Sequence, residues 1–200
     1  MNYHNIKEYD IANGPGIRTS IWVTGCRANC VGCFNTDIKD FASGNPFDKQ
    51  ALDKLIKCLQ NKNVRGLSIL GGEPLDNVFG VLDMVGNIIS NVDEFNLRHP
   101  YKKDIWLWTG KVMPSVMKGY FNPDTINEDE AKLNLIAMCD YVVDGPFLQE
   151  RMNHNIRFRG SDNQRILKVI KKTDNTFGIK LIFEDVSALY DAGKSTPPKK

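Results

Sequence analysis

The sequence predicts an α/β fold, in the form of a partial, open parallel β/α barrel. Strand-like and helix-like segments alternate along most of the 200 residues, an order typical of parallel βαβ units with right-handed crossovers. The segment 105–109, IWLWT, is apolar at consecutive positions, as strands covered on both faces are. Only about five strands can be read, whereas a closed eight-stranded barrel needs ~250 residues.

Each predicted element has its own signal. Residues 17–24, IRTSIWVT, are rich in β-branched side chains and predict a strand that ends at Gly25. A helix is predicted from Asp48 to Lys62, because apolar residues recur there at helical spacing and Asp48 is a suitable N-cap. The same reasoning predicts a helix at 78–89 and strands at 67–70, 105–109 and 141–143.

The rest of the chain gives weaker signals. Pro, Gly and Asn punctuate residues 112–130, which predicts a long loop. The segment 178–186, GIKLIFEDV, is a candidate for one more strand, and residues 190–200 are expected to fray. We therefore expect a barrel domain at 1–172 and a partly flexible C-terminal extension at 173–200.

Charge and hydropathy narrow the class of protein. The chain has 26 Lys and Arg against 24 Asp and Glu, and a net charge of +2 gives no reason to expect nucleic acid or membrane as a partner. The N-terminus lacks a basic region followed by an apolar run, and no stretch approaches the ~18 apolar residues of a membrane span. We expect a cytoplasmic protein, in which clustered cysteines bind metal or do chemistry rather than form disulfides.

The most informative stretch is GCRANCVGC at 25–33. It holds three of the five cysteines, Cys26, Cys30 and Cys33, at the spacing C-x3-C-x2-C. Three thiols in one short loop, directly after a predicted strand, are hard to explain as core packing. The sequence therefore predicts a metal centre at the carboxyl end of that strand.

Two kinds of metal centre are compatible with three cysteines. A structural zinc ion prefers four ligands, but His4, His99 and His154 lie far from the loop in sequence, and Cys58 and Cys139 read as small buried hydrophobes. A four-iron cluster takes four cysteines when fully ligated, so three would leave one iron without a protein ligand. Such a vacancy is a coordination site for a bound molecule, which favours an enzyme.

A second motif, Gly71-Gly72-Glu73-Pro74, follows the predicted strand at 67–70. Two glycines allow the backbone to approach a ligand closely, and the Glu73 carboxylate can pair with an ammonium group. An ordinary strand-to-helix turn with Pro74 in its first helical turn is the alternative interpretation. Both motifs would lie at the carboxyl ends of neighbouring strands, where barrel active sites form.

Together the two motifs resemble those of the radical S-adenosylmethionine (SAM) superfamily. The resemblance implies a [4Fe–4S] cluster on three cysteines, with the amino and carboxylate groups of SAM on the fourth iron. The implied cluster ligands are Cys26, Cys30 and Cys33, and the implied contacts to the methionine end of SAM are Gly71, Gly72 and Glu73.

The adenine contacts depart from the usual pattern of that superfamily. Many members carry an aromatic residue just before the third cysteine, Cys33, where this chain has Gly32. We therefore expect Gly32, Cys33 and Phe34 to lie near the adenine, with Phe34 contributing partly through its backbone.

Further stretches are similar to one branch, the activases of glycyl radical enzymes. Residues 13–18, NGPGIR, resemble the (D/N)GPG-x-R signature of these activases. DIWLWTG at 104–110, VDGPF at 143–147 and RGSDNQ at 159–164 resemble the activases of anaerobic (class III) ribonucleotide reductase. The resemblance runs from residue 1 to about residue 168, so the extension lies outside it.

The resemblance implies a mechanism. A flavodoxin-type protein delivers one electron, and SAM is cleaved to methionine and a 5′-deoxyadenosyl radical. This radical takes a hydrogen atom from the Cα of one glycine in the large reductase subunit, so no general acid or base is needed. Asn13 to Arg18 are candidates for the peptide entrance, Trp106 and Trp108 for the cavity lining, and Asp144 and Arg159 for substrate contacts.

Two alternatives remain open at this point. The target could be another glycyl radical enzyme, of the pyruvate formate-lyase type, or a small molecule; the stretches DIWLWTG and RGSDNQ argue against both. From a different class, the chain could be a zinc-stabilised binding module without catalysis.

Overall fold

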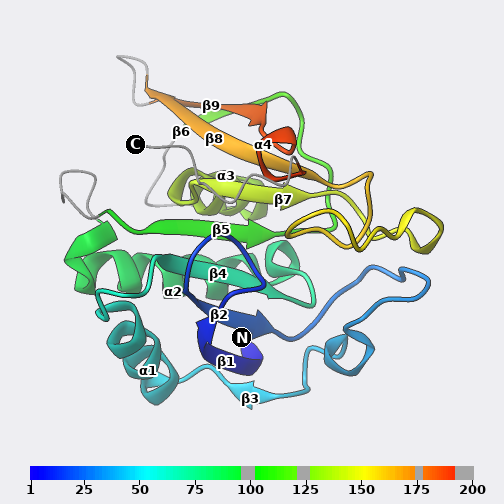
Figure 1. The fold of residues 1–200 in the computed structure, drawn as a ribbon. Coiled ribbons are helices and arrows are strands. Elements are labelled where there is room, and N and C mark those ends of the chain that lie inside the picture. The colour runs from blue at the N-terminus through cyan, green and yellow to red at the C-terminus, as the bar shows by residue number, and fades with distance from the viewer. Residues whose placement is uncertain (96–101, 121–126, 174–177, 192–200) are drawn as a thin grey trace.

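One large mixed sheet organises the chain in the computed structural model, which describes residues 1–95, 102–120, 127–173 and 178–191 (Figure 1). The described strands lie in the order β3-β1-β2-β4-β5-β7-β8-β9-β6. Their bounds are β1 Asn2–Asp10, β2 Arg18–Val23, β3 Asn45–Pro46, β4 Gly66–Gly71, β5 Asp104–Trp108, β6 Val116–Tyr120, β7 Tyr141–Asp144, β8 Arg165–Thr173 and β9 Gly178–Asp185. The helices are α1 Lys49–Leu59, α2 Val78–Asn91, α3 Glu128–Met138 and the short α4 Ala188–Asp191.

The centre of the sheet is parallel, as predicted. Strands β2, β4, β5 and β7 are parallel neighbours, and α1, α2 and α3 occur in the connections between them. The α/β class is thus confirmed. The expectation of about five strands was wrong, because antiparallel strands flank this centre on both sides and bring the described sheet to nine strands.

The sheet buries different side chains on its two faces. On β5, Ile105 and Leu107 join the large core that the helices cover, whereas Trp106 belongs to a second cluster on the opposite face. The helices pack beside one another, with α2 between α1 and α3. Because both faces of β5 are covered, its residues are apolar at consecutive positions, as the sequence indicated.

The first strand had no readable signal in the sequence. β1, NYHNIKEYD, is mostly polar, and only Ile6 and Asp10 of its nine residues are buried. It nevertheless pairs antiparallel with β2 on one side and with the two-residue β3 on the other. A strand so exposed has no apolar alternation, so periodicity could not reveal it.

Residues 112–130 are not one long loop, and this expectation was wrong. They contain β6 and the start of α3, which Asn127 and Glu130 begin with a reciprocal capping box. The candidate strand at 178–186 is confirmed as β9, which pairs with both β8 and β6. The expected boundary at residue 172 falls within β8 and stays a prediction, and most of the expected frayed end, 192–200, lies outside the described residues.

The first helix shows how closely local signals fixed an element. The Asp48 side chain caps it by accepting a hydrogen bond from the Ala51 N–H at 3.0 Å, as predicted. Ala51, Leu55 and Leu59 form its buried face. The helix ends at Leu59, three residues before the predicted end at Lys62.

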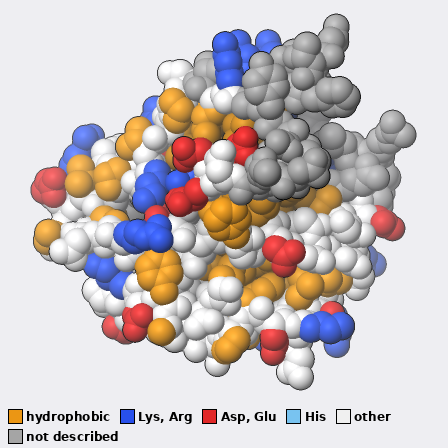
Figure 2. All heavy atoms as spheres, turned by 180° about the vertical axis from the view of Figure 1, so that it is seen from behind, with side chains coloured by type: hydrophobic (Ala, Val, Ile, Leu, Met, Phe, Trp, Pro, Cys, Tyr) orange, Lys and Arg blue, Asp and Glu red, His pale blue; other side chains and the backbone are white. Residues whose placement is uncertain are grey.

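The surface carries charges of both signs. Figure 2 shows one face of the molecule, on which basic and acidic side chains are interspersed with apolar ones. This distribution agrees with the small net charge of +2. Within the described ranges, no helix is both long and apolar enough to cross a membrane.

Candidate functional site

The two predicted motifs meet in one cavity. The cysteine loop follows β2 and the Gly71-Gly72 turn ends β4, so both lie at the carboxyl ends of parallel neighbours. They open onto a cavity of about 410 Å³. Its walls include most of the predicted site residues, namely Cys26, Cys30, Cys33, Phe34, Gly71, Gly72 and Glu73.

One predicted residue is not a wall residue. Gly32 has a positive φ of 68°, and a Cβ at this position would lie 2.6 Å from the Oε1 atom of Gln149. Gly32 therefore serves the turn between Cys30 and Cys33 and is not among the described residues that line the cavity. Phe34 does line it, and its ring packs against Phe147 with the centroids 4.8 Å apart.

The three thiols are free, and two of them accept backbone hydrogen bonds. The Ala28 N–H donates to Cys26 Sγ and the Asn35 N–H donates to Cys33 Sγ, each at 3.4 Å. Hydrogen bonds of this kind tune iron–sulfur centres. In the described part of the chain, no three Cys, His, Asp or Glu side chains are grouped as ligands of a single metal ion. A four-iron cluster does not need such a group, because each thiolate binds a different iron.

The thiol of Cys26 is held in its neutral form in the free protein. Burial raises its pKa, and the carboxylates of Glu73 and Asp76 raise it further, while a hydrogen bond with Ala28 opposes them. A metal centre binds the thiolate, so its binding at Cys26 would release a proton.

The other two cysteines lie elsewhere in the fold. Cys139 is fully buried and donates from its Sγ to the Leu135 carbonyl at 3.3 Å. Burial raises the pKa of Cys139 to about 12, so it stays a thiol. Cys58 belongs to α1, and neither residue is among the cavity walls of the described chain. His4 and His154 are absent from these walls too, and His99 lies outside the described residues.

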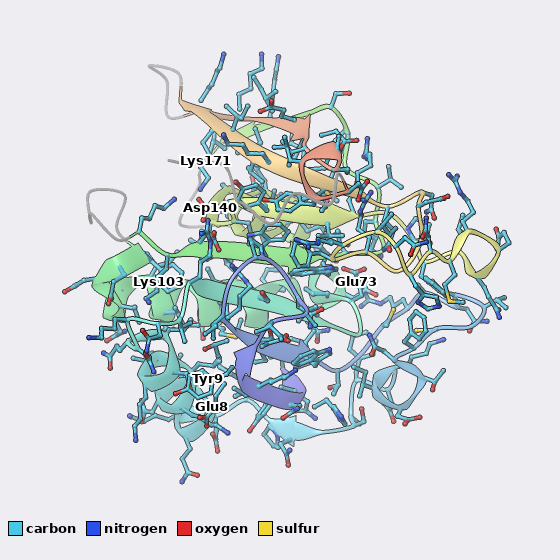
Figure 3. The ribbon with its side chains drawn as sticks, viewed as in Figure 1. Glu8, Tyr9, Glu73, Lys103, Asp140 and Lys171 are labelled. Atoms are coloured by element: carbon cyan, nitrogen blue, oxygen red, sulfur yellow. The ribbon has the colours of Figure 1, made fainter. Side chains whose placement is uncertain are left out.

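Glu73 is the most constrained acidic side chain of the site. It is 2% exposed, and its carboxylate accepts three hydrogen bonds, from the Leu75 N–H at 3.0 Å and from Thr109 Oγ1 and the Gly110 N–H at 2.8 Å. Burial raises the pKa of Glu73 above its ordinary value, although these hydrogen bonds and Lys111 oppose the rise. Figure 3 places Glu73 at the end of the sheet opposite Lys103 and Asp140.

The two glycines before Glu73 are required by packing. A Cβ on Gly71, whose φ is 121°, would lie 2.3 Å from the Val23 carbonyl oxygen. A Cβ on Gly72 would lie 2.3 Å from the carbonyl oxygen of Gly25. The glycines therefore let the turn after β4 lie directly against the start of the cysteine loop.

A second acidic residue ties the cysteine loop to the end of β5. Asp76 accepts a hydrogen bond from the Arg27 N–H at 2.8 Å, and its other oxygen pairs with Lys111 Nζ at 3.0 Å. Asn77 donates to the Thr24 carbonyl at 2.9 Å. Sequence reasoning missed both residues and also Thr109. A polar side chain in a turn gives no sequence pattern that shows whether it bonds to another segment of the chain or only to solvent.

We expect the Asp76→Ala variant to lose iron to a chelator several-fold faster than the wild type. Without Asp76, the Arg27 N–H and Lys111 lose their common partner, and the cysteine loop is held less firmly. The rate of iron loss can be followed by the absorbance of protein that has been reconstituted with iron and sulfide. Asp53→Ala, which breaks an exposed pair with Lys49 on α1, is the control and should match the wild type.

The candidates for the peptide entrance, the cavity lining and the substrate contacts separate into two groups. Asn13, Trp108 and Arg159 line the cavity, whereas Arg18, Trp106 and Asp144 are not among its described walls. Asp144 is fully buried and pairs with Arg165, a structural role. Sequence reasoning also missed aromatic wall residues: no motif marked Trp22 or Phe158, and Phe147 lies in the VDGPF stretch but was given no role there.

The sequence matches known proteins over most of its length. A family model described as a 4Fe-4S single cluster domain matches residues 12–167. The chain is 34% identical over 170 residues to a Vibrio cholerae protein named anaerobic ribonucleoside-triphosphate reductase-activating protein, covering 83% of this chain and 97% of that protein. Proteins of the same name match from Escherichia coli K12, at 34% identity over 82% of this chain and 96% of that protein, and from enterobacteria phage T4, at 33% over 83% and 93%.

Proposed function

The chain belongs to the family of anaerobic ribonucleoside-triphosphate reductase-activating proteins, and we propose that it activates such a reductase by generating a glycyl radical on its large subunit. One observation carries the proposal. Three free thiols and the Gly71–Glu73 turn line the same cavity at the carboxyl ends of β2 and β4. A cavity so built can hold an iron–sulfur cluster beside a small cationic cofactor.

Cys26, Cys30 and Cys33 are the proposed ligands of the cluster. Their thiols line the cavity, and the Ala28 and Asn35 N–H groups already point at two of the sulfur atoms. The loop is pinned at its start, because Gly25 and Cys26 N–H groups donate to the carbonyls of Ile38 and Lys39. Soft thiolates of this kind suit iron–sulfur clusters.

Gly71, Gly72 and Glu73 are the proposed contacts to the methionine end of SAM. A carboxylate has about four lone-pair positions, and three hydrogen bonds occupy Glu73, which leaves capacity for one ammonium group. When bound, the reduced cluster and SAM would supply the radical chemistry that removes a hydrogen atom from the target glycine. The protein supplies orientation and shielding, and no described side chain has to transfer a proton.

The walls of the cavity suit such chemistry. Trp22, Phe34, Trp108, Phe147 and Phe158 line it with aromatic rings, which exclude water from reacting atoms. We place the adenine beside Phe34 and Cys33, and the target peptide nearer Asn13, which lies in the loop between β1 and β2.

Three further parts of the proposal concern the setting of the reaction. We infer that the parallel strands form a partial barrel, with the site at their carboxyl ends. We also infer that a flavodoxin-type protein delivers the electron. The reducing cytoplasm would keep the three thiols available for the cluster.

SAM affinity is expected to increase as the pH rises through the pKa of Glu73, because only the ionised carboxylate attracts the ammonium group. Burial raises that pKa, so the change should fall at higher pH than for an ordinary carboxyl group. Calorimetric titration of the reconstituted protein at several pH values measures it. Glu73→Gln should weaken SAM binding and remove the pH dependence in this range; an unchanged dependence would assign it to another group.

The proposed function is tested with the reconstituted protein, SAM, a reductant and the anaerobic reductase. Electron paramagnetic resonance should show the doublet of a glycyl radical on the reductase and none on pyruvate formate-lyase. A radical on pyruvate formate-lyase alone would assign the chain to another target. One zinc ion per chain, with no iron, would assign it instead to the zinc-stabilised modules.

A further inference from the structure

The last described residues of the chain, 186–191, reach the far wall of the cavity. We call them the C-terminal cap; they contain α4 and lie beyond the part of the chain that the family model matches, 12–167 (Figure 1). The cap is anchored at the start of β8. The Val186 N–H donates to the Ile166 carbonyl, and the Ile166 N–H donates to Ser187 Oγ, both at 2.8 Å.

Tyr190 of the cap supports the aromatic wall of the cavity. Its ring packs edge-on against Trp106 and Phe158, with the centroids 5.6 Å apart in each case. Phe158 lines the cavity with a positive φ of 63°, and its carbonyl accepts a hydrogen bond from Trp108 Nε1 at 2.8 Å. A non-glycine residue in this conformation persists only where its surroundings hold it, and Tyr190 is part of what holds Phe158.

Asp191 of the cap supports the charged residue of the same wall. It pairs with the Arg159 guanidinium, whose side chain is only 4% exposed. Arg159 also donates to the Gln164 carbonyl at 3.0 Å and lines the cavity. A guanidinium buried to this extent depends on its carboxylate partner for its position.

The wall held by the cap and the proposed contacts to the cluster and to the methionine end of SAM follow or precede different strands. The cysteines and Gly71–Glu73 follow β2 and β4, whereas Phe158 and Arg159 precede β8, three places beyond β4 in the order β4-β5-β7-β8. An arginine and an aromatic ring on that side suit a peptide backbone, because guanidinium N–H groups donate to carbonyl oxygens.

We propose that the C-terminal cap fixes the substrate side of the cavity. Tyr190 and Asp191 are positioning residues, which act through Phe158 and Arg159 on the peptide that carries the target glycine. This inference rests on the proposed function and adds to it a role for a segment outside the matched family region.

The test compares Asp191→Asn and Tyr190→Leu with the wild type. Three quantities are measured: the affinity for the reductase without reductant and the affinity for SAM, both by calorimetry, and the amount of 5′-deoxyadenosine formed per glycyl radical. Asp191→Asn should weaken reductase binding about tenfold, since a charged hydrogen bond to a buried group is lost. Both variants should form several-fold more 5′-deoxyadenosine per glycyl radical, while SAM affinity stays at the wild-type value.

Conservative variants and a matched control separate positioning from stability. Asp191→Glu and Tyr190→Phe should restore most of the coupling, by which we mean the number of glycyl radicals formed per 5′-deoxyadenosine. Glu184→Gln, which changes an exposed carboxylate on β9, should behave as the wild type. If Asp191→Asn and Tyr190→Leu only lower the melting temperature and keep wild-type coupling and reductase affinity, the proposal is wrong. Absence of a glycyl radical with the wild type would contradict the proposed function instead.

Discussion

The Cys30→Ala variant is expected to retain less than one iron per chain after anaerobic reconstitution, against about four in the wild type, and to lose reductive cleavage of SAM. Cys30 is the central thiol of the three that line the cavity. With two protein ligands left, the cluster is held at only two of its irons. Iron and sulfide analysis measures the first effect, and chromatographic detection of 5′-deoxyadenosine measures the second.

Cys58→Ala is the matched control for this experiment. Cys58 lies on α1, which packs on the face of the sheet that the helices cover. It is not among the described walls of the cavity. The variant should keep its iron and its SAM cleavage. If it lost the cluster as Cys30→Ala does, the assignment of three ligands would be wrong.

The Arg18→Leu variant is expected to lower the free energy of unfolding by about 3–5 kcal/mol. Arg18 is fully buried, and its guanidinium donates to Ser68 Oγ at 2.6 Å, to Asp104 Oδ1 at 2.5 Å and to the Leu67 carbonyl at 2.8 Å. It thereby joins the first residues of β2, β4 and β5. Leucine would leave these acceptors without their donor in a buried place.

Urea unfolding of the cluster-free protein measures this effect without any contribution from iron. Arg65→Leu is the control, because Arg65 pairs with the same Asp104 but is 40% exposed. It should cost about 1 kcal/mol or less. Equal losses for the two variants would show that the buried network around Arg18 contributes no more to stability than an exposed ion pair.

Sequence reasoning recovered those parts whose signal is local. The cap of α1, the parallel strands and the cysteine loop could be predicted because residue types and spacing alone identify them. β6 and the start of α3 could not, since β6 exists only by pairing with β9 about sixty positions later. Likewise Thr109 and Asp76 become site residues only once the ends of β4 and β5 lie side by side.

The same limit applies to the far side of the cavity. Arg159 was a candidate from its motif, but the residue that holds it, Asp191, belongs to a stretch with no motif at all. Tyr190 reaches Trp106 across more than eighty residues of sequence. Contacts of this range depend on the completed topology, which the order of elements along the chain does not determine.

The place of β9 has a consequence for synthesis on the ribosome. β9 lies between β8 and β6, and β6 has no other strand neighbour in the described sheet, although it is translated some sixty residues earlier. β6 must therefore wait for almost the entire chain to emerge before it can be paired. The cysteine loop and the Gly71–Glu73 turn are both synthesised by Asn77, well before β8, β9 and the C-terminal cap on the opposite side of the cavity.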